Sequence, residues 1–177
     1  MPGPDHARGR PDADECLPYY FQYIRLVPDG PILEALERQI TESAAFLGAF
    51  TPPQALRREA PGEWNVLEIV GHLADVERVF GYRALRIARA DPVMWTGVEF
   101  ADYAAAANFQ DRPLGDVVAE LTAVRAASLA LLRGLDAAAW QRRAPGDWTL
   151  RSVRAIAYAV AGHELHHLAD IRRQHPG

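Results

Sequence analysis

Residues 156–171 read IAYAVAGHELHHLADI, and this stretch decides the fold class. Apolar residues recur at steps of three and four through Ile156, Val160 and Ile171, which is the repeat of one face of an α-helix. His163 and His167 fall on the same stripe, one turn apart. The pattern therefore predicts a helix that turns two imidazoles toward the interior of a helical protein.

The same periodicity predicts three earlier helices, over about 31–47, 65–90 and 113–133. Asn65 and Glu68 have the spacing of a capping box at the start of the second helix, and Thr149 is the expected N-cap of the last helix. No segment shows a sustained strand alternation between turn signals. We therefore predict an all-α protein of four helices, with residues 91–112 as a long connection that crosses the bundle or carries function.

Two similar segments precede the second and the fourth helix. Residues 57–64 read RREAPGEW and residues 142–148 read RRAPGDW. Each pairs a turn-forming Gly with an acidic residue and a Trp, which is a good entry into a helix. The repeat indicates two helical hairpins of similar design.

Length and charge limit what the chain can be. Its 177 residues suit one domain, and we expect a flexible leader over 1–16 followed by a single helical domain over 17–177. The net charge is −4 and Lys is absent, so nucleic-acid binding and lysine-based Schiff-base chemistry are not expected. No apolar run is long enough for a membrane span, and the single Cys16 cannot form an internal disulfide. A cytoplasmic protein is the expectation.

His72 lies between Ile69 and Val76 on the apolar stripe of the second predicted helix. One inward His is usually a core residue bonded to a neighbour, but burying three without partners costs ~1–3 kcal/mol each. A divalent metal offsets that cost and binds the neutral imidazole. We therefore predict that His72, His163 and His167 hold one ion with an open position, as in catalytic sites. Three imidazoles suit Zn, Ni, Fe or Co.

Residues 163–167 also match H-E-x-x-H, in which Glu164 would be the general base of a zinc peptidase. The longer motif of this class requires Gly at 170 and His at 173, where this chain has Asp170 and Arg173, and no Glu follows for the alternative pattern. We therefore expect His72 as the third ligand, with Glu164 as a candidate catalytic residue that orients a ligand or shuttles protons. Other candidates for such roles are Asp75, His166 and Asp170.

Over roughly residues 28–175 the chain resembles the DinB/YfiT-like superfamily of metal-dependent enzymes. The likeness is carried by Trp64 before EIVGHLAD at 68–75, by the pairs Glu77-Arg78 and Tyr82-Arg83, and by GHELHHL at 162–168. The resemblance implies a four-helix bundle of up-down-down-up topology with one long crossover between helices 2 and 3. It places the family's metal ligands on His72, His163 and His167.

The resemblance also implies two activities on a small-molecule substrate. The first is S-transfer of a low-molecular-weight thiol such as mycothiol or bacillithiol, and the second is metal-dependent hydrolysis of an amide-type bond. The all-Arg basic content is compatible with a thiol-using bacterium of GC-rich genome. The alternative to an enzyme is a non-catalytic bundle that a metal only stabilises. A homodimer is compatible with the family. The candidate lining residues of a pocket under the long connection are Trp95, Phe100, Tyr103 and Phe109.

Overall fold

The computed structural model describes residues 8–92, 97–144 and 149–175, and within these ranges the protein is helical with only isolated β-bridges. The four long helices are α3 (Ile32–Leu47), α5 (Val66–Ala88), α7 (Leu114–Arg133) and α9 (Val153–Gln174). The short ones are η1 (Pro18–Tyr20), α2 (Phe21–Ile24), α4 (Pro52–Leu56), α6 (Phe100–Ala106), η2 (Phe109–Asp111) and α8 (Ala137–Gln141). None of the described helices combines the length and the apolarity that crossing a bilayer requires.

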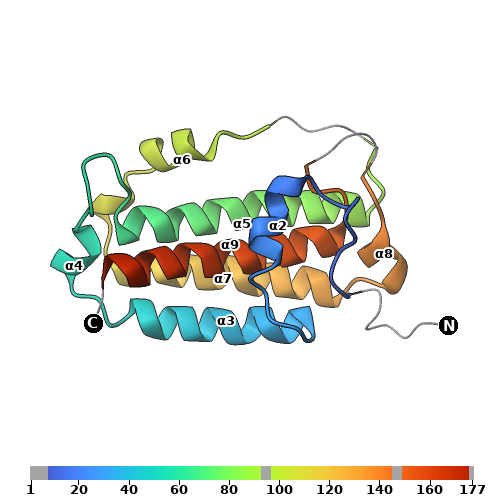
Figure 1. The fold of residues 1–177 in the computed structure, drawn as a ribbon, viewed down its shortest axis with the longest axis horizontal. Coiled ribbons are helices and arrows are strands. Elements are labelled where there is room, and N and C mark those ends of the chain that lie inside the picture. Colours follow the sequence, from blue (N-terminus) through green and yellow to red (C-terminus); the bar gives the residue numbers. More distant parts are fainter. Residues whose placement is uncertain (1–7, 93–96, 145–148, 176–177) are drawn as a thin grey trace.

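The long helices form a bundle in which α5 and α7 run one way and α3 and α9 run the other (Figure 1). Both α3 and α5 pack against α7 and against α9. Because α5 and α7 are parallel, the chain between them returns along the bundle, and α6 lies on that return path. The predicted all-α, up-down-down-up bundle with a crossover between its second and third long helices is confirmed.

The two helices that carry the histidines begin in different ways. At α5 the predicted capping box is present, since Asn65 accepts from the backbone of Glu68 and Glu68 accepts from the backbone of Asn65. At α9 the predicted N-cap Thr149 is wrong, because Ser152 caps the helix instead. Residues 149–152 are held in extended pairing with a distant segment, and the Arg151 N–H donates to the Glu15 carbonyl at 2.7 Å. Residues 145–148 of the second repeated segment lie outside the described residues.

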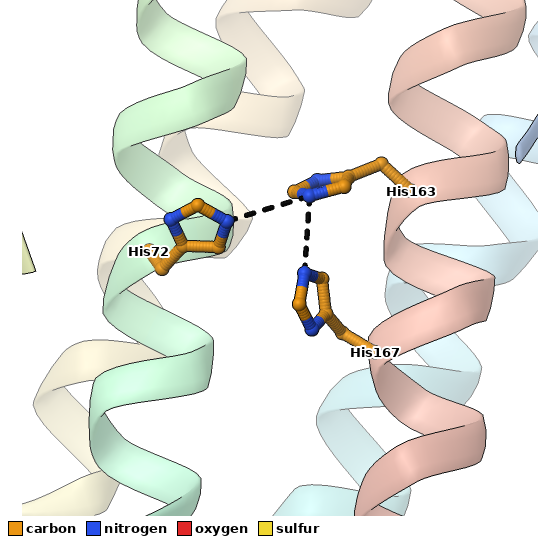
Figure 2. A group of neighbouring side chains, drawn as sticks. All are labelled: His72, His163 and His167. Atoms are coloured by element: carbon orange, nitrogen blue, oxygen red, sulfur yellow. Dashed lines mark hydrogen bonds between the residues drawn. The ribbon is translucent and has the colours of Figure 1, made fainter. Parts of the chain in front are cut away.

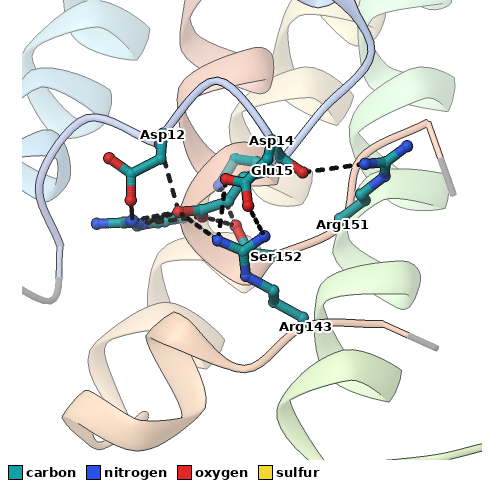
Figure 3. Close-up of polar contacts among 8 residues, drawn as sticks. Asp12, Asp14, Glu15, Arg143, Arg151 and Ser152 are labelled. Atoms are coloured by element: carbon teal, nitrogen blue, oxygen red, sulfur yellow. Dashed lines mark hydrogen bonds and ion pairs between the residues drawn. The ribbon is translucent and has the colours of Figure 1, made fainter. Parts of the chain in front are cut away.

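Residues 8–16, which the composition predicts to be part of a flexible leader, are instead packed against the start of α9 (Figure 3). The side chain of Glu15 is buried and accepts hydrogen bonds from Ser152 and Arg154. Arg10 donates to two backbone carbonyls of the following segment. The charged residues of this segment, which the composition suggests are solvated, thus pair with residues elsewhere in the fold: Glu15 with Arg154, and Arg10 with Asp29. Residues 1–7 lie outside the described part of the chain.

The connection 91–112, expected as a long loop, contains α6 and η2. Phe109 in η2 is buried against Gly71 of α5, where an added Cβ would collide with the phenyl ring. The glycine therefore lets the end of the crossover sit directly on α5, one residue before His72. Trp95 lies outside the described residues.

A polar network crosses the middle of the bundle. Arg125 of α7 is 1% exposed and donates to Glu77 of α5 at 2.8 and 2.9 Å and to Glu164 of α9 at 2.6 Å. It also donates to the Leu36 carbonyl of α3 at 3.1 Å, and Ser43 of α3 donates to Glu164. Burial disfavours the charged guanidinium, but the two carboxylates outweigh burial and raise the pKa of Arg125. The network therefore ties all four long helices together.

This polar network separates two apolar clusters. Buried apolar residues of α9 up to Ala161 pack in one cluster, and those from Leu168 onward pack in the other. The same division falls between Ala74 and Val76 on α5. The histidines of α5 and α9 lie near this boundary, so their polar rings are placed between the two apolar clusters and not inside either one.

Candidate metal centre

The three predicted ligands meet between α5 and α9 (Figure 2). His72 comes from α5, and His163 and His167 come from consecutive turns of α9. The Nε2 atom of His163 lies 3.4 Å from Nε2 of His72 and 3.0 Å from Nε2 of His167. One ring nitrogen of each histidine lies within 4.8 Å of the others, which is a spacing that one metal ion can bridge. The helical spacing read from the sequence thus places the three side chains together.

The chemistry of this donor set fits a cation better than it fits hydrogen bonds. A neutral imidazole has one N–H and one lone pair, so Nε2 of His163 can satisfy at most one of its two nitrogen contacts. A bound divalent cation would satisfy all three lone pairs together. Zn–N bonds of 2.0–2.1 Å in a tetrahedral site separate the ligand nitrogens by about 3.3 Å. The observed separations of 3.0 and 3.4 Å lie on either side of that value.

The surroundings keep these imidazoles in the form that metals bind. Burial lowers the pKa of His72 to about 3, with a smaller contribution from His167. Burial also lowers the pKa of His167 to about 4, aided by His166, and it holds the pKa of His163 well below its ordinary value. All three rings are therefore neutral at pH 7, so no proton has to leave before a metal binds.

Glu164 directly follows His163 in the sequence, but its carboxylate is engaged in the polar network. One oxygen accepts from the Ser43 hydroxyl at 2.5 Å, and the other accepts from Arg125 at 2.6 Å. Its side chain is 2% exposed. Both oxygens are thus held by partners on α3 and α7, which suits a residue that fixes the rotation of α9 beside His163.

The other polar candidates of the sequence lie around the site with partners of their own. Asp75 pairs with Arg78 at 3.2 Å, and Asp170 pairs with Arg173 at 2.8 Å. His166 lies 3.5 Å from Asp170, and its side chain is 42% exposed. The His166 ring also packs edge-on against His167, at 5.2 Å between ring centroids, but none of these three residues adds an atom to the cluster of His72, His163 and His167.

A cavity of about 310 Å³ opens beside the histidines. Its walls are mostly aromatic, and the lining residues are Tyr19, Tyr20, Tyr23, Trp64, His72, Val76, Phe80, Phe100, Ala159, His163 and His167. Of the aromatic residues expected from the connection 91–112, Phe100 lines the cavity, Tyr103 contacts the Phe100 ring from outside the lining, and Phe109 is buried in the core. The volume lies at the small end of ligand pockets, roughly 300–1,000 Å³.

Sequence reasoning missed the tyrosines of this cavity. Tyr19 and Tyr20 come from η1, and Tyr23 comes from α2, which packs against α9. The available signal was the aromatic density of residues 19–23 together with Gly162. An added Cβ at Gly162 would collide with the backbone of Tyr23, so the glycine marks where this segment rests on α9.

A second cluster of possible ligands, Asp12, Asp14 and Glu15, lies far from the histidines in the sequence. Arg154 pairs with Asp12 and Glu15, and Arg143 pairs with Asp14 (Figure 3). These carboxylates are therefore already neutralised by guanidinium groups. Of the two clusters found in the described ranges, the histidines are the one whose donor atoms remain available to a cation.

Comparison with known proteins gives a family and a fold. A family model described as the DinB superfamily matches residues 35–171. A solved structure of YfiT from Bacillus subtilis, described as a probable metal-dependent hydrolase with an unusual four-helix bundle topology, matches with a TM-score of 0.62. The two sequences are 19% identical, and the match covers 92% of this chain and 91% of YfiT. No protein with a curated description matches this sequence.

Proposed function

This protein belongs to the DinB superfamily, and on that premise we propose that it is a metal-dependent hydrolase of small molecules. His72, His163 and His167 would hold one divalent ion, and the aromatic cavity beside them would take the substrate. The observation that carries the proposal is the convergence of three neutral imidazoles at the wall of a cavity. The description of YfiT as a probable metal-dependent hydrolase on the same fold supports it.

The roles of the residues follow from their positions. A divalent ion bound by three imidazoles would supply Lewis-acid chemistry for hydrolysis. Imidazole nitrogen is a suitable donor for Zn, Ni, Fe and Co alike, so the donor type does not select one of these metals. His163 and His167 present Nε2 atoms from one helix, and His72 closes the set from the other. Glu164, through Ser43 and Arg125, holds the helix turn that carries His163. Trp64 packs on the His72 ring with 4.7 Å between ring centroids and limits its rotation.

Thiol S-transfer, the first activity implied by the sequence resemblance, has no observation of its own in the described residues. A thiol such as bacillithiol or mycothiol carries polar and charged groups that need hydrogen bonds or counter-charges when buried. The described lining of the cavity offers tyrosine hydroxyls and histidine nitrogens but no Asp, Glu or Arg side chain as a counter-charge. We therefore propose hydrolysis before thiol transfer, and the experiment below tests whether turnover depends on an added thiol.

The experiment compares wild type with His72→Ala and His166→Ala, purified without a His tag and loaded with Zn²⁺. We expect one ion per chain and hydrolysis of members of a neutral ester and amide panel. The His72→Ala substitution removes a ligand, so metal content and rate should both fall, the rate by roughly a hundredfold or more. The His166→Ala substitution removes an imidazole that packs edge-on against His167, at 5.2 Å between ring centroids, but supplies no nitrogen to the ligand set, so both quantities should stay close to wild type.

Three results would contradict the proposal. Retention of metal and rate in His72→Ala would exclude this histidine as a ligand. Turnover that requires an added low-molecular-weight thiol would replace hydrolysis by thiol transfer. Inactivity on the whole panel, combined with a large metal-dependent rise in Tm, would favour the metal-stabilised, non-catalytic bundle.

A further inference from the structure

We infer that the site selects a substrate that carries a flat, uncharged apolar group, such as an aromatic ring, next to the bond that reacts. This inference rests on the proposed function, because it assigns the substrate class of the same cavity. It is carried by the composition of the walls, by the way the walls are fixed in place, and by the absence of Asp, Glu and Arg from the described lining.

The walls form a continuous set of rings around the histidines. The Phe100 ring of α6 lies 5.8 Å from His72 and 6.2 Å from Phe80 of α5, measured between ring centroids. Tyr20 of η1 lies 6.3 Å from Phe80 on the other side. Aromatic faces and edges at these separations favour offset or edge contacts with another ring. Ala159 is small and leaves space between the rings and α9.

A charge on that group would be unmatched by the cavity wall, because it would lie away from the bound ion. Among the described lining residues there is no Asp, Glu or Arg, and the three histidines are the only titratable nitrogen groups. Arg83 packs over the Phe80 ring with its guanidinium carbon 5.8 Å from the ring centroid, but it does not line the cavity. A charged group buried against this wall, out of reach of the bound ion, would have no counter-charge to offset its loss of hydration. A cationic substrate would in addition be repelled by the bound divalent ion.

The aromatic wall is held before any substrate arrives. Tyr23 is 8% exposed, its hydroxyl is 2.8 Å from that of Tyr19, and its ring packs edge-on against His163 at 5.2 Å between centroids. Its backbone rests directly on Gly162, where any side chain would lift it. Since the segment is already seated on α9, substrate binding does not have to order it, which favours selection by shape.

The test uses three metal-binding probes that share a hydroxamate and differ in the tail. These are acetohydroxamate, benzohydroxamate and 4-carboxybenzohydroxamate, titrated by calorimetry into the full-length protein loaded with Zn²⁺. We expect benzohydroxamate to bind roughly tenfold more tightly than acetohydroxamate, since its ring is buried against the wall. The carboxylate should weaken benzohydroxamate binding by roughly tenfold or more.

Two variants test whether the aromatic wall causes the preference for benzohydroxamate. Tyr20→Leu removes a half-buried wall ring from η1 and should reduce the ratio of benzohydroxamate affinity to acetohydroxamate affinity severalfold, with one Zn²⁺ per chain retained. Tyr82→Leu is the matched control, because Tyr82 is 55% exposed on α5 and does not line this cavity. It should leave all three affinities unchanged.

The outcomes separate this inference from the proposed function. Failure to load Zn²⁺ would overturn both. One Zn²⁺ per chain with equal affinities for the acetyl and benzoyl probes would overturn the substrate class alone. Equal or tighter binding of the carboxylate probe would also overturn it and would direct attention to Arg83. An equal loss of preference in the Tyr20 and Tyr82 variants would show that the wall does not select.

Discussion

Arg125→Met is expected to lower the free energy of unfolding by about 3–5 kcal/mol, because it leaves two carboxylates buried without their cation. The side chains of Glu77 and Glu164 are 3% and 2% exposed, and Arg125 is the guanidinium that bridges them. Methionine fills much of the arginine volume, so the loss would come from charge rather than from a void. Urea denaturation followed by circular dichroism measures the change.

Two controls test the origin of this effect. Arg133→Met removes an arginine from the same helix, where the pair with Glu37 is half exposed on both sides, and should cost at most about 1 kcal/mol. The triple substitution Arg125→Met, Glu77→Gln and Glu164→Gln removes the two carboxylate charges as well and should recover much of the lost stability. Similar losses for Arg125→Met and Arg133→Met would contradict the account of a buried charge network.

Gly162→Ala is the second substitution with a large expected effect. Alanine is the better helix former by about 1 kcal/mol, so propensity alone predicts a gain in stability. The added Cβ, however, would collide with the carbonyl group of Tyr23, which is backbone and cannot rotate away as a side chain can. We therefore expect a net loss of about 1–3 kcal/mol in the free energy of unfolding, as for other overpacked contacts.

Gly81→Ala supplies the matched control for this prediction. Gly81 is also within a long helix, but an added Cβ there meets only the Ser128 hydroxyl at an ordinary contact distance of 3.7 Å. This variant should be as stable as wild type or up to about 1 kcal/mol more stable. If Gly162→Ala and Gly81→Ala had the same free energy of unfolding in the urea titration, the close contact of the Tyr23 backbone with α9 would be refuted.

The three-and-four spacing of apolar residues was enough to predict the long helices and the inward direction of the histidines. His163 and His167 fall on the stripe of Ile156 and Val160, and local geometry alone then directs both rings inward. His72 follows from the same argument on α5. A capping box is equally local, which is why the start of α5 could be predicted from Asn65.

Features that depend on contacts distant in the sequence were missed or misplaced. Thr149 looks as good an N-cap as Ser152 until the pairing with residues 15–17 is known. The ordered residues 8–16 depend on Arg154, more than a hundred positions away. For the polar network a signal existed, since Arg125 lies four residues from both Leu121 and Leu129 on an apolar stripe, but its partners come from three other helices.

The central claim is that imidazoles from α5 and α9 bind one metal ion at the aromatic cavity. Crystals of Zn²⁺-loaded protein, measured on both sides of the zinc absorption edge, test it most directly. The account predicts one anomalous peak about 2.0–2.1 Å from a ring nitrogen of each of His72, His163 and His167. A peak at Asp12, Asp14 and Glu15 instead, or three histidine rings linked only by hydrogen bonds in fully loaded crystals, would contradict it.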